Sequence, residues 1–158
     1  MRFSLKRKIE ISPNNLDRLI VLAKKALETN DVPVASILLY GEEIIGEGYN
    51  TVFRNNAAGE HAEINAVSDA LSKLGLEKFS RLDRNSLVLI STFEPCLMCI
   101  GMCINYNIRN VYYLQEKDQR DVVKERKLLM KYYFFRKQVS HHGEQIALFQ
   151  LHPDYPRR

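Results

Sequence analysis

The sequence predicts an α/β protein, a three-layer α/β/α sandwich around a mixed five-stranded sheet. Three observations lead to this fold class. Apolar residues recur at i, i+3 and i+4 spacing from Leu16 to Leu27, behind the helix-start pair Ser12-Pro13. The turn sequence at 41–43 joins two apolar runs as a hairpin. Beyond it, short apolar runs alternate with helical patterns, which requires crossover connections and helices on both faces of the sheet.

The first half of the chain is expected to contain the hairpin and a second helix. Residues 34–40 form an apolar run without polar alternation, which is typical of a buried strand, and residues 44–49 return beside it. Residues 51–60 are polar and rich in asparagine, so we expect a loop there. Residues 61–74 carry apolar side chains on one helical face.

The second half alternates strands and helices. Residues 75–86 are expected to be a charged connection. The elements predicted after it are a strand at 87–92, a helix at 95–106, a strand at 111–114, a helix at 118–137 and a strand at 146–151. Four consecutive aromatic residues at 132–135 cannot all face one core. We therefore expect some to be buried and others exposed, at a subunit interface or a base-stacking surface.

Length and composition are those of one soluble globular domain, predicted to span residues 1–158. Hydrophobic residues make up 46% and charged residues 27% of the chain. No apolar run reaches the roughly 18 residues that cross a membrane, and the basic residues 1–8 lack the apolar stretch of a secretion signal. These features favour a cytoplasmic location and no membrane partner. The net charge of +4 fits either a solvated helix face or contact with a polyanion.

Two short segments carry candidate metal ligands. His61 opens one predicted helix, and Cys96 and Cys99 open another in the sequence Pro-Cys-Leu-Met-Cys. Cysteine and histidine suit Zn²⁺, and a helix N-terminus favours the thiolate form that binds metal. Three protein ligands leave a fourth position for water, the pattern of catalytic rather than structural zinc. We therefore expect one zinc ion at these residues.

Glu63 stands two residues after His61, so it projects differently and need not bind the metal. It could take a proton from a water on the zinc and return protons to a substrate. Alone, C-x-x-C could also be redox-active or half of a structural zinc site. Together, H-x-E and P-C-x-x-C form the signature of zinc-dependent nucleobase deaminases.

With these motifs, the sequence resembles the cytidine/deoxycytidylate deaminase superfamily, in particular its branch of tRNA-specific adenosine deaminases and guanine deaminases. The resemblance covers residues 32–114, about half of the chain. It rests on four segments, Val-Pro-Val-Ala at 32–35, Gly-Glu-Gly-Tyr-Asn at 46–50, Thr-Phe-Glu-Pro-Cys-Leu-Met-Cys at 92–99, and Ile-Arg-Asn-Val at 108–111.

The resemblance implies a cytidine deaminase-like fold and further roles in the site. By position, Asn50 would hydrogen-bond the substrate ring, the backbone of Ala62 would contact the reacting base, and Phe93 and Glu94 would border the pocket. The implied activity is hydrolytic release of ammonia from a nucleobase, nucleoside or nucleotide, with purine favoured, by attack of zinc-bound hydroxide with Glu63 as proton shuttle. Relatives of this kind are dimers or larger, so we also expect a homodimer or a larger homo-oligomer.

Two other functions stay open at this point. One is a tRNA adenosine-to-inosine editing deaminase, and the other is a zinc-stabilised binding protein without catalysis. The chain departs from its apparent relatives at Glu60, where a small residue is usual, and after Leu114. The choice of nucleobase therefore depends on the segment after Leu114, where Glu116 and Asp118 are candidates.

Overall fold

The computed structural model describes residues 11–140 and 142–151. The basic N-terminal segment and the proline-containing tail at 152–158 lie outside this range. The chain divides into two compact units, Met1–Lys117 and Asp118–Arg158. No helix in the described part of the chain is long and apolar enough to span a membrane. The prediction of one deaminase domain over the whole length stays a prediction.

The first unit is built around a four-stranded mixed sheet of order β2-β1-β3-β4. Its strands are β1 (Ala35–Tyr40), β2 (Glu43–Tyr49), β3 (Leu87–Phe93) and β4 (Asn110–Gln115). β1 runs antiparallel to both β2 and β3, whereas β4 runs parallel to β3. The α/β class and the mixed sheet are therefore confirmed, with four strands in the described residues instead of five.

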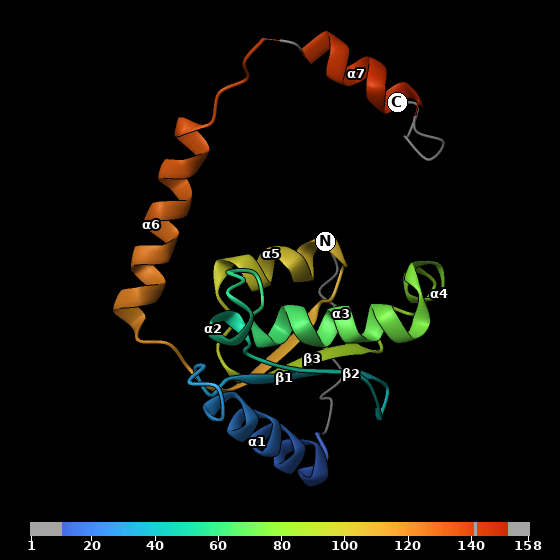
Figure 1. The fold of residues 1–158 in the computed structure, drawn as a ribbon, viewed down its shortest axis with the longest axis vertical. Helices are drawn as coiled ribbons and strands as arrows, with labels where there is room; N and C mark the ends of the chain where they lie inside the picture. Colours follow the sequence, from blue (N-terminus) through green and yellow to red (C-terminus); the bar gives the residue numbers. More distant parts are fainter. Residues whose placement is uncertain (1–10, 141, 152–158) are drawn as a thin grey trace, which may run out of the picture. The chain divides into compact units, whose positions relative to one another are not determined.

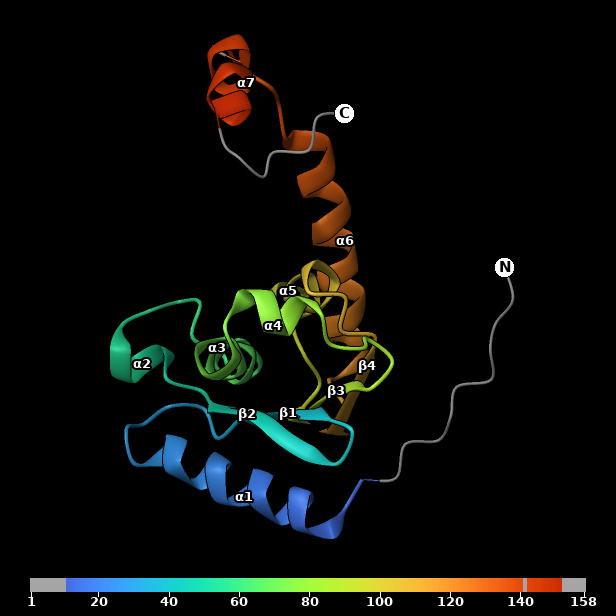
Figure 2. The same ribbon diagram turned by 90° about the vertical axis from the view of Figure 1, so that its right-hand side faces the viewer.

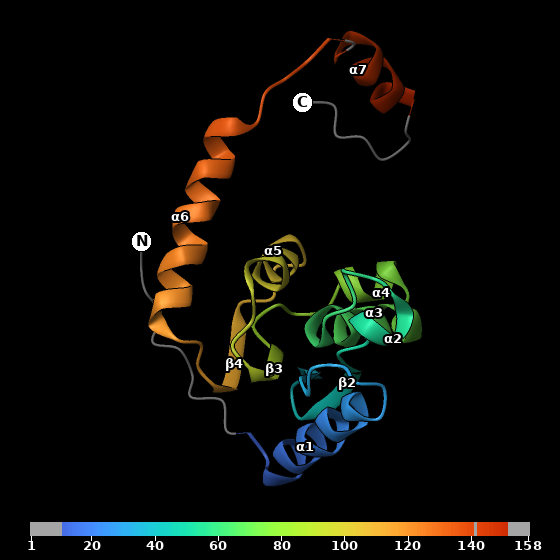
Figure 3. The ribbon, with the colours of Figure 1, turned by 60° about the vertical axis from the view of Figure 1, so that its left-hand side comes forward.

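Helices cover both faces of this sheet, as the three-layer prediction requires (Figures 1 and 2). α1 (Pro13–Leu27) lies on one face. α3 (Ala62–Leu74), α4 (Leu76–Ser80) and α5 (Leu97–Asn105) lie on the other (Figure 3). The short helix α2 (Val52–Asn55) occupies part of the predicted 51–60 loop, and α4 occupies part of the predicted 75–86 connection.

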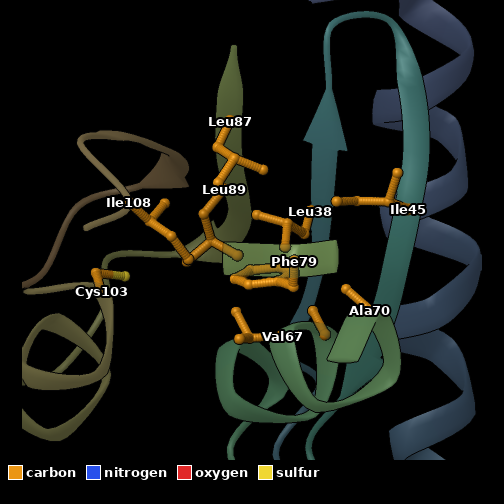
Figure 4. Packing of buried hydrophobic residues seen from close by; sticks show 10 residues of the cluster. Leu38, Ile45, Val67, Ala70, Phe79, Leu87, Leu89, Cys103 and Ile108 are labelled. Atoms are coloured by element: carbon orange, nitrogen blue, oxygen red, sulfur yellow. The ribbon is translucent and has the colours of Figure 1, made fainter. Parts of the chain in front are cut away.

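One hydrophobic cluster fills each interface between the layers. Against α1, the buried side chains include Leu19, Leu22, Ile37 and Ile90. On the other face, Phe79 of α4 packs among residues of the sheet and of α3 (Figure 4). The residues of this second cluster are Leu38, Ile45, Ala66, Val67, Ala70, Phe79, Leu87, Leu89, Cys103 and Ile108. The buried residues of α1 are Leu19, Leu22, Ala23 and Ala26, whereas Ile20 and Leu27, which belong to the same predicted apolar face, are exposed. In α3 the fully buried apolar residues are Ala62, Ala66, Val67 and Ala70, and the predicted Ile64, Leu71 and Leu74 are only partly buried.

The second unit contains α6 (Gln119–Phe135) and α7 (His142–Leu151). The strand predicted at 146–151 is wrong, because these residues belong to α7. A six-residue apolar run has no period that separates strand from helix, and its Ala, Leu and Gln residues, like the preceding Glu144 and Gln145, favour helix. The four aromatic residues at 132–135 are 53–81% exposed, so the expectation that some are buried is wrong too.

Candidate zinc site and adjoining pocket

The direction of the strands brings distant segments to one end of the sheet. The carboxyl ends of β2, β3 and β4 meet there with the amino end of β1, because β1 alone runs in the opposite direction. The segments that leave these ends are residues 50–61 after β2, 94–96 after β3 and 116–117 after β4, and residues 30–34 enter β1 at the same end. The candidate metal ligands come from these segments and from the first turn of α5.

His61, Cys96 and Cys99 come together at this end of the sheet. His61 is the N-cap residue of α3, and Cys96 is the N-cap residue of α5, with Cys99 in its first turn. Cys96 Sγ lies 3.6 Å from His61 Nδ1 and 3.6 Å from Cys99 Sγ, and Cys99 Sγ lies 3.7 Å from His61 Nδ1. The three candidate ligand atoms therefore form a nearly equilateral triangle.

This triangle has the size that zinc requires. Around a tetrahedral zinc ion with Zn–S bonds of about 2.3 Å and Zn–N bonds of about 2.0–2.1 Å, two sulfurs lie about 3.8 Å apart, and a sulfur and a nitrogen about 3.6 Å. The three measured distances fall within about 0.2 Å of these values, the tolerance expected of a real site. Because no fourth protein ligand joins the cluster among the described residues, one coordination position would remain for water or substrate.

The ionisation of the two cysteines differs. The pKa of Cys96 is lowered to about 5, chiefly because the Cys99 thiol hydrogen-bonds to its sulfur, with help from the backbone N–H of Cys99. The pKa of Cys99 is raised by the same hydrogen bond and by burial. Cys96 is thus ready as a thiolate, whereas Cys99 would lose its proton when a metal binds.

Glu63 lies beside this cluster without joining it. It stands in the first turn of α3, is 4% exposed, and lines a pocket that also includes His61 and Cys96. Burial raises the pKa of its carboxyl group. By contrast, Cys103 packs in the hydrophobic cluster of Figure 4, where burial raises the pKa of its thiol to about 11. Cys103 lies one helical turn after Cys99 and is a small buried residue of the core.

The pocket has a volume of about 500 Å³, within the range of small-molecule sites. All four residues that the sequence suggested for the substrate, Asn50, Ala62, Phe93 and Glu94, line it. Asn50 Oδ1 accepts a hydrogen bond from the backbone N–H of Val52 at 3.2 Å. The oxygen of the Asn50 amide is therefore engaged, and its NH₂ group is the part left to contact a ligand.

Two hydrogen bonds connect the segment after β3 with the segment after β4. Glu94 Oε2 accepts from the backbone N–H of Lys117 at 2.9 Å, and Lys117 Nζ donates to Pro95 O at 3.2 Å. Lys117 lines the pocket, whereas the two candidates beside it do not. Glu116 is exposed, and Asp118 caps α6 by accepting from the backbone N–H of Arg120 at 2.8 Å.

Two acidic residues that hold the segments around the pocket were missed by the sequence reasoning. Asp31 is 4% exposed and lines the pocket. Glu60, noted only as a departure from the relatives, accepts hydrogen bonds from Thr51 Oγ1 and Asn55 Nδ2. Asp31 precedes a strand and has no local motif, so nothing in the sequence indicated its role. For Glu60, the only indication in the sequence was the polar, asparagine-rich segment at 51–60 that contains it.

Comparison with known proteins agrees with this geometry. Residues 13–115 match the family model described as the cytidine and deoxycytidylate deaminase zinc-binding region. The chain is 38% identical over 88 residues to a tRNA-specific adenosine deaminase of Buchnera aphidicola, covering 56% of this chain and 55% of that one. It is 33% identical over 90 residues to tRNA-specific adenosine deaminase 2 of Xenopus laevis, covering 56% and 51%. The chain thus spans about half the length of the curated relatives it matches.

Solved structures give the same picture of the fold. A structure from a study of A-to-I editing by tRNA:A34 deaminases matches with a TM-score of 0.58 and 30% identity, covering 66% of this chain and 76% of that one. Guanine deaminase from Bacillus subtilis matches with a TM-score of 0.70 over 92% of this chain and 99% of that one, but at 22% identity it shows the fold alone. With the matched region covering well over half of its length, the chain belongs to the cytidine and deoxycytidylate deaminase zinc-binding family.

Proposed function

We propose that this protein is a zinc-dependent hydrolytic deaminase that converts adenosine to inosine in tRNA. The observation that carries the proposal is a triangle of ligand atoms of zinc dimensions beside a base-sized pocket. The choice of substrate is supported by the identity of 38% to a tRNA-specific adenosine deaminase. The favoured sequence-based hypothesis, a deaminase of free purine bases, nucleosides or nucleotides, has weaker support, since the guanine deaminase likeness concerns the fold alone.

His61, Cys96 and Cys99 would hold the metal. Zinc bound there would act as a Lewis acid and bring the pKa of a coordinated water to about 7. The reaction adds water to the ring carbon that bears the amino group, and ammonia leaves as the carbonyl forms. Glu63 would carry protons, and this role is supported by its position in the pocket beside the ligands, without being one of them. It takes a proton from the attacking water and delivers protons to the ring nitrogen and the departing ammonia.

The other pocket residues orient the base. The NH₂ group of Asn50 donates to an acceptor on the substrate, since its oxygen is held by Val52. Ala62 is the first residue of α3, so no intrahelical carbonyl accepts its N–H, which is available to the base. Phe93 and Glu94 border the pocket, and Glu94 also holds the segment that carries Lys117. In tRNA the target base must leave its stack to enter such a pocket.

The test compares substrates on one zinc-loaded preparation. Inosine in tRNA is measured by nucleoside chromatography, beside ammonia release from a panel of free purine and pyrimidine bases, nucleosides and nucleotides. We expect inosine in tRNA and little ammonia from the panel. Efficient turnover of a free purine with none on tRNA would instead establish the small-molecule deaminase.

Two variants test the mechanism. Glu63→Ala should keep the zinc and the fold but lower turnover by at least about 10²-fold, the scale of general acid–base catalysis. Cys96→Ala should lose both zinc and turnover, as measured by metal analysis. Unchanged turnover in Glu63→Ala would refute the proton-carrying role. A wild-type protein that holds zinc but deaminates nothing in either assay would favour a zinc-stabilised binding protein. The expected homodimer or larger homo-oligomer and the cytoplasmic location stay predictions.

A further inference from the structure

Phe53 is an exposed aromatic residue at the edge of the pocket. Its side chain is 70% exposed, and it lines the pocket together with Val32, which is 61% exposed. Neither residue belongs to the hydrophobic clusters that fill the two faces of the sheet. A single exposed apolar side chain is ordinary on a protein surface. What distinguishes Phe53 is its place at the pocket and the way in which its backbone is held.

Asp31 fixes the backbone of Phe53. Asp31 Oδ1 accepts from the N–H of Phe53 at 2.6 Å, and Oδ2 accepts from the N–H of Arg54 at 3.1 Å. Oδ2 also accepts from Thr29 Oγ1 at 2.8 Å. A buried carboxylate is costly unless it is hydrogen-bonded, and three donors meet this requirement here. Burial acts to raise the pKa of Asp31, but the hydrogen bonds from Phe53, Thr29 and Arg54 outweigh it and lower that pKa.

The arrangement makes Asp31 a positioning residue. Both of its oxygens are engaged by the protein, so its carboxylate is committed to holding α2 and not to contacting a substrate. It ties the segment that enters β1 to the segment that follows β2, and these two segments carry Val32 and Phe53.

A second set of hydrogen bonds holds the segment after β2, which contains Phe53. Glu60 accepts from Thr51 Oγ1 and Asn55 Nδ2. Asn65 of α3 donates from Nδ2 to Tyr49 O at 2.8 Å and to Thr51 Oγ1 at 2.9 Å. Phe53 therefore stands on a short helix that is anchored to two different parts of the fold. A rigid aromatic side chain loses little conformational entropy when a ligand binds to it.

We propose that Phe53 is a stacking platform for the nucleotide next to the reacting adenosine, and that Asp31 holds this platform in place. The inference rests on the proposed action on tRNA. When a base in a loop turns into a pocket, the neighbouring base loses its stacking partner and exposes its face. An exposed aromatic ring at the pocket edge replaces that partner without regard to base sequence. A free base or nucleoside has no neighbour to stack and would not use it.

The first test measures turnover of a short stem-loop RNA that carries the target adenosine. Phe53→Ala should raise KM about tenfold or more, the scale of one lost base–aromatic stack, with a small change in kcat. Phe53→Tyr should restore KM, and zinc content should be unchanged in both proteins. Asp31→Ala should raise KM by a similar factor, and the double variant should be little worse than either single variant, because the two residues act as one unit.

The second test reads stacking directly and needs no turnover. The chain contains no tryptophan and eight tyrosines, so Phe53→Trp introduces a single tryptophan at the platform, whose emission is excited selectively at wavelengths where tyrosine does not absorb. Binding of the stem-loop RNA to the zinc-loaded protein, with Glu63→Ala added to prevent reaction, should quench this fluorophore. Leu76→Trp is the matched control, because Leu76 is similarly exposed at 66% but lies on α4 and does not line the pocket. Its emission should change little.

The outcomes separate this inference from the proposed function. If the protein makes inosine in RNA but Phe53→Ala leaves KM unchanged, the platform is wrong and the function stands. If no RNA is deaminated but the RNA quenches Phe53→Trp and not Leu76→Trp, the platform stands and the proposed reaction fails. Equal quenching of Phe53→Trp by free adenosine would overturn stacking of a neighbouring nucleotide. Should Asp31→Ala fail to fold, the Phe53 series still decides the matter.

Discussion

Gly48 of β2 lies directly against the first residues of α3. A Cβ atom added to Gly48 would lie 2.4 Å from Ala66 N, 2.5 Å from Ala62 O and 2.7 Å from Asn65 Cβ. Ordinary van der Waals contact begins near 3.4 Å, so the helix or the strand would have to retreat by about 1 Å. Two of the three atoms belong to the backbone and cannot rotate away. Gly48→Ala must therefore displace β2 or the first turn of α3, and His61 lies between these two elements in the chain.

The expected cost follows from that displacement. Overpacking a well-packed region typically costs about 1–3 kcal/mol, and the rigid backbone places Gly48→Ala in the upper half of this range. Zinc ligands keep their distances to within about 0.2 Å, so a shift of about 1 Å at His61 should also weaken metal binding. We expect zinc affinity to fall by about 10- to 100-fold, as when the support of a metal ligand is removed.

The measurements are urea unfolding and zinc competition against a chromophoric chelator. Gly101→Ala is the matched control, because Gly101 lies in α5 near the cysteine ligands and a Cβ atom there meets nothing within 4 Å. That change should be neutral or stabilise the protein by up to about 1 kcal/mol through helix propensity. A Gly48→Ala protein within about 0.5 kcal/mol of wild type and with unchanged zinc affinity would refute the account of the β2–α3 contact.

Two further predictions concern the stability of the first unit. Phe79 is 1% exposed and packs edge-on against Tyr106, so Phe79→Ala should cost about 3–5 kcal/mol in urea unfolding, and a loss below about 1.5 kcal/mol would contradict its place in the core. Glu47 accepts two hydrogen bonds from Arg18, which lower its pKa from 4.5 against the opposing effect of burial. A lowered pKa stabilises the fold above pH 4.5 and less as the pH falls through the folded-state value, so Arg18→Ala should cost at most about 1 kcal/mol at pH 7 in this partly exposed pair. The difference from wild type should shrink toward pH 3, and a difference that is constant with pH would exclude the ion pair as its cause.

The fold was predictable where sequence patterns are long. α1 is an amphipathic helix with four buried residues on one face, and the strands β1 and β3 are largely apolar segments that are buried almost throughout. The patterns failed for short segments. α2 has four residues and α4 has five, too few for a helical period to be recognised. The first turn of α2 is capped by Asp31, 22 residues before Phe53 in the chain, and no local rule anticipates such a partner.

The zinc ligands and the pocket wall also differ in how well the sequence predicts them. The candidate zinc ligands were predictable because the spacing of Cys96 and Cys99, and the helix starts at His61 and Cys96, are local properties of the sequence. The pocket wall depends on pairings between distant residues. Asp31 contacts α2, and Glu94 contacts Lys117, 23 residues later. A single sequence contains no direct record of such pairs.

The metal ligands and the pocket wall are held in place in different ways. The candidate ligands lie at the starts of α3 and α5, whose other residues pack in the hydrophobic core. A displacement of the ligands therefore also disturbs the packing of these two helices. The pocket wall is held mainly by side-chain carboxylates that accept backbone and side-chain donors, as at Asp31 and Glu60. Asp31 lies outside the helices that carry the ligands, so its exchange should disturb α2 more than those helices. We therefore expect substitutions in residues 30–34 and 50–60 to alter KM and substrate choice, and those at His61, Cys96 and Cys99 to abolish zinc binding.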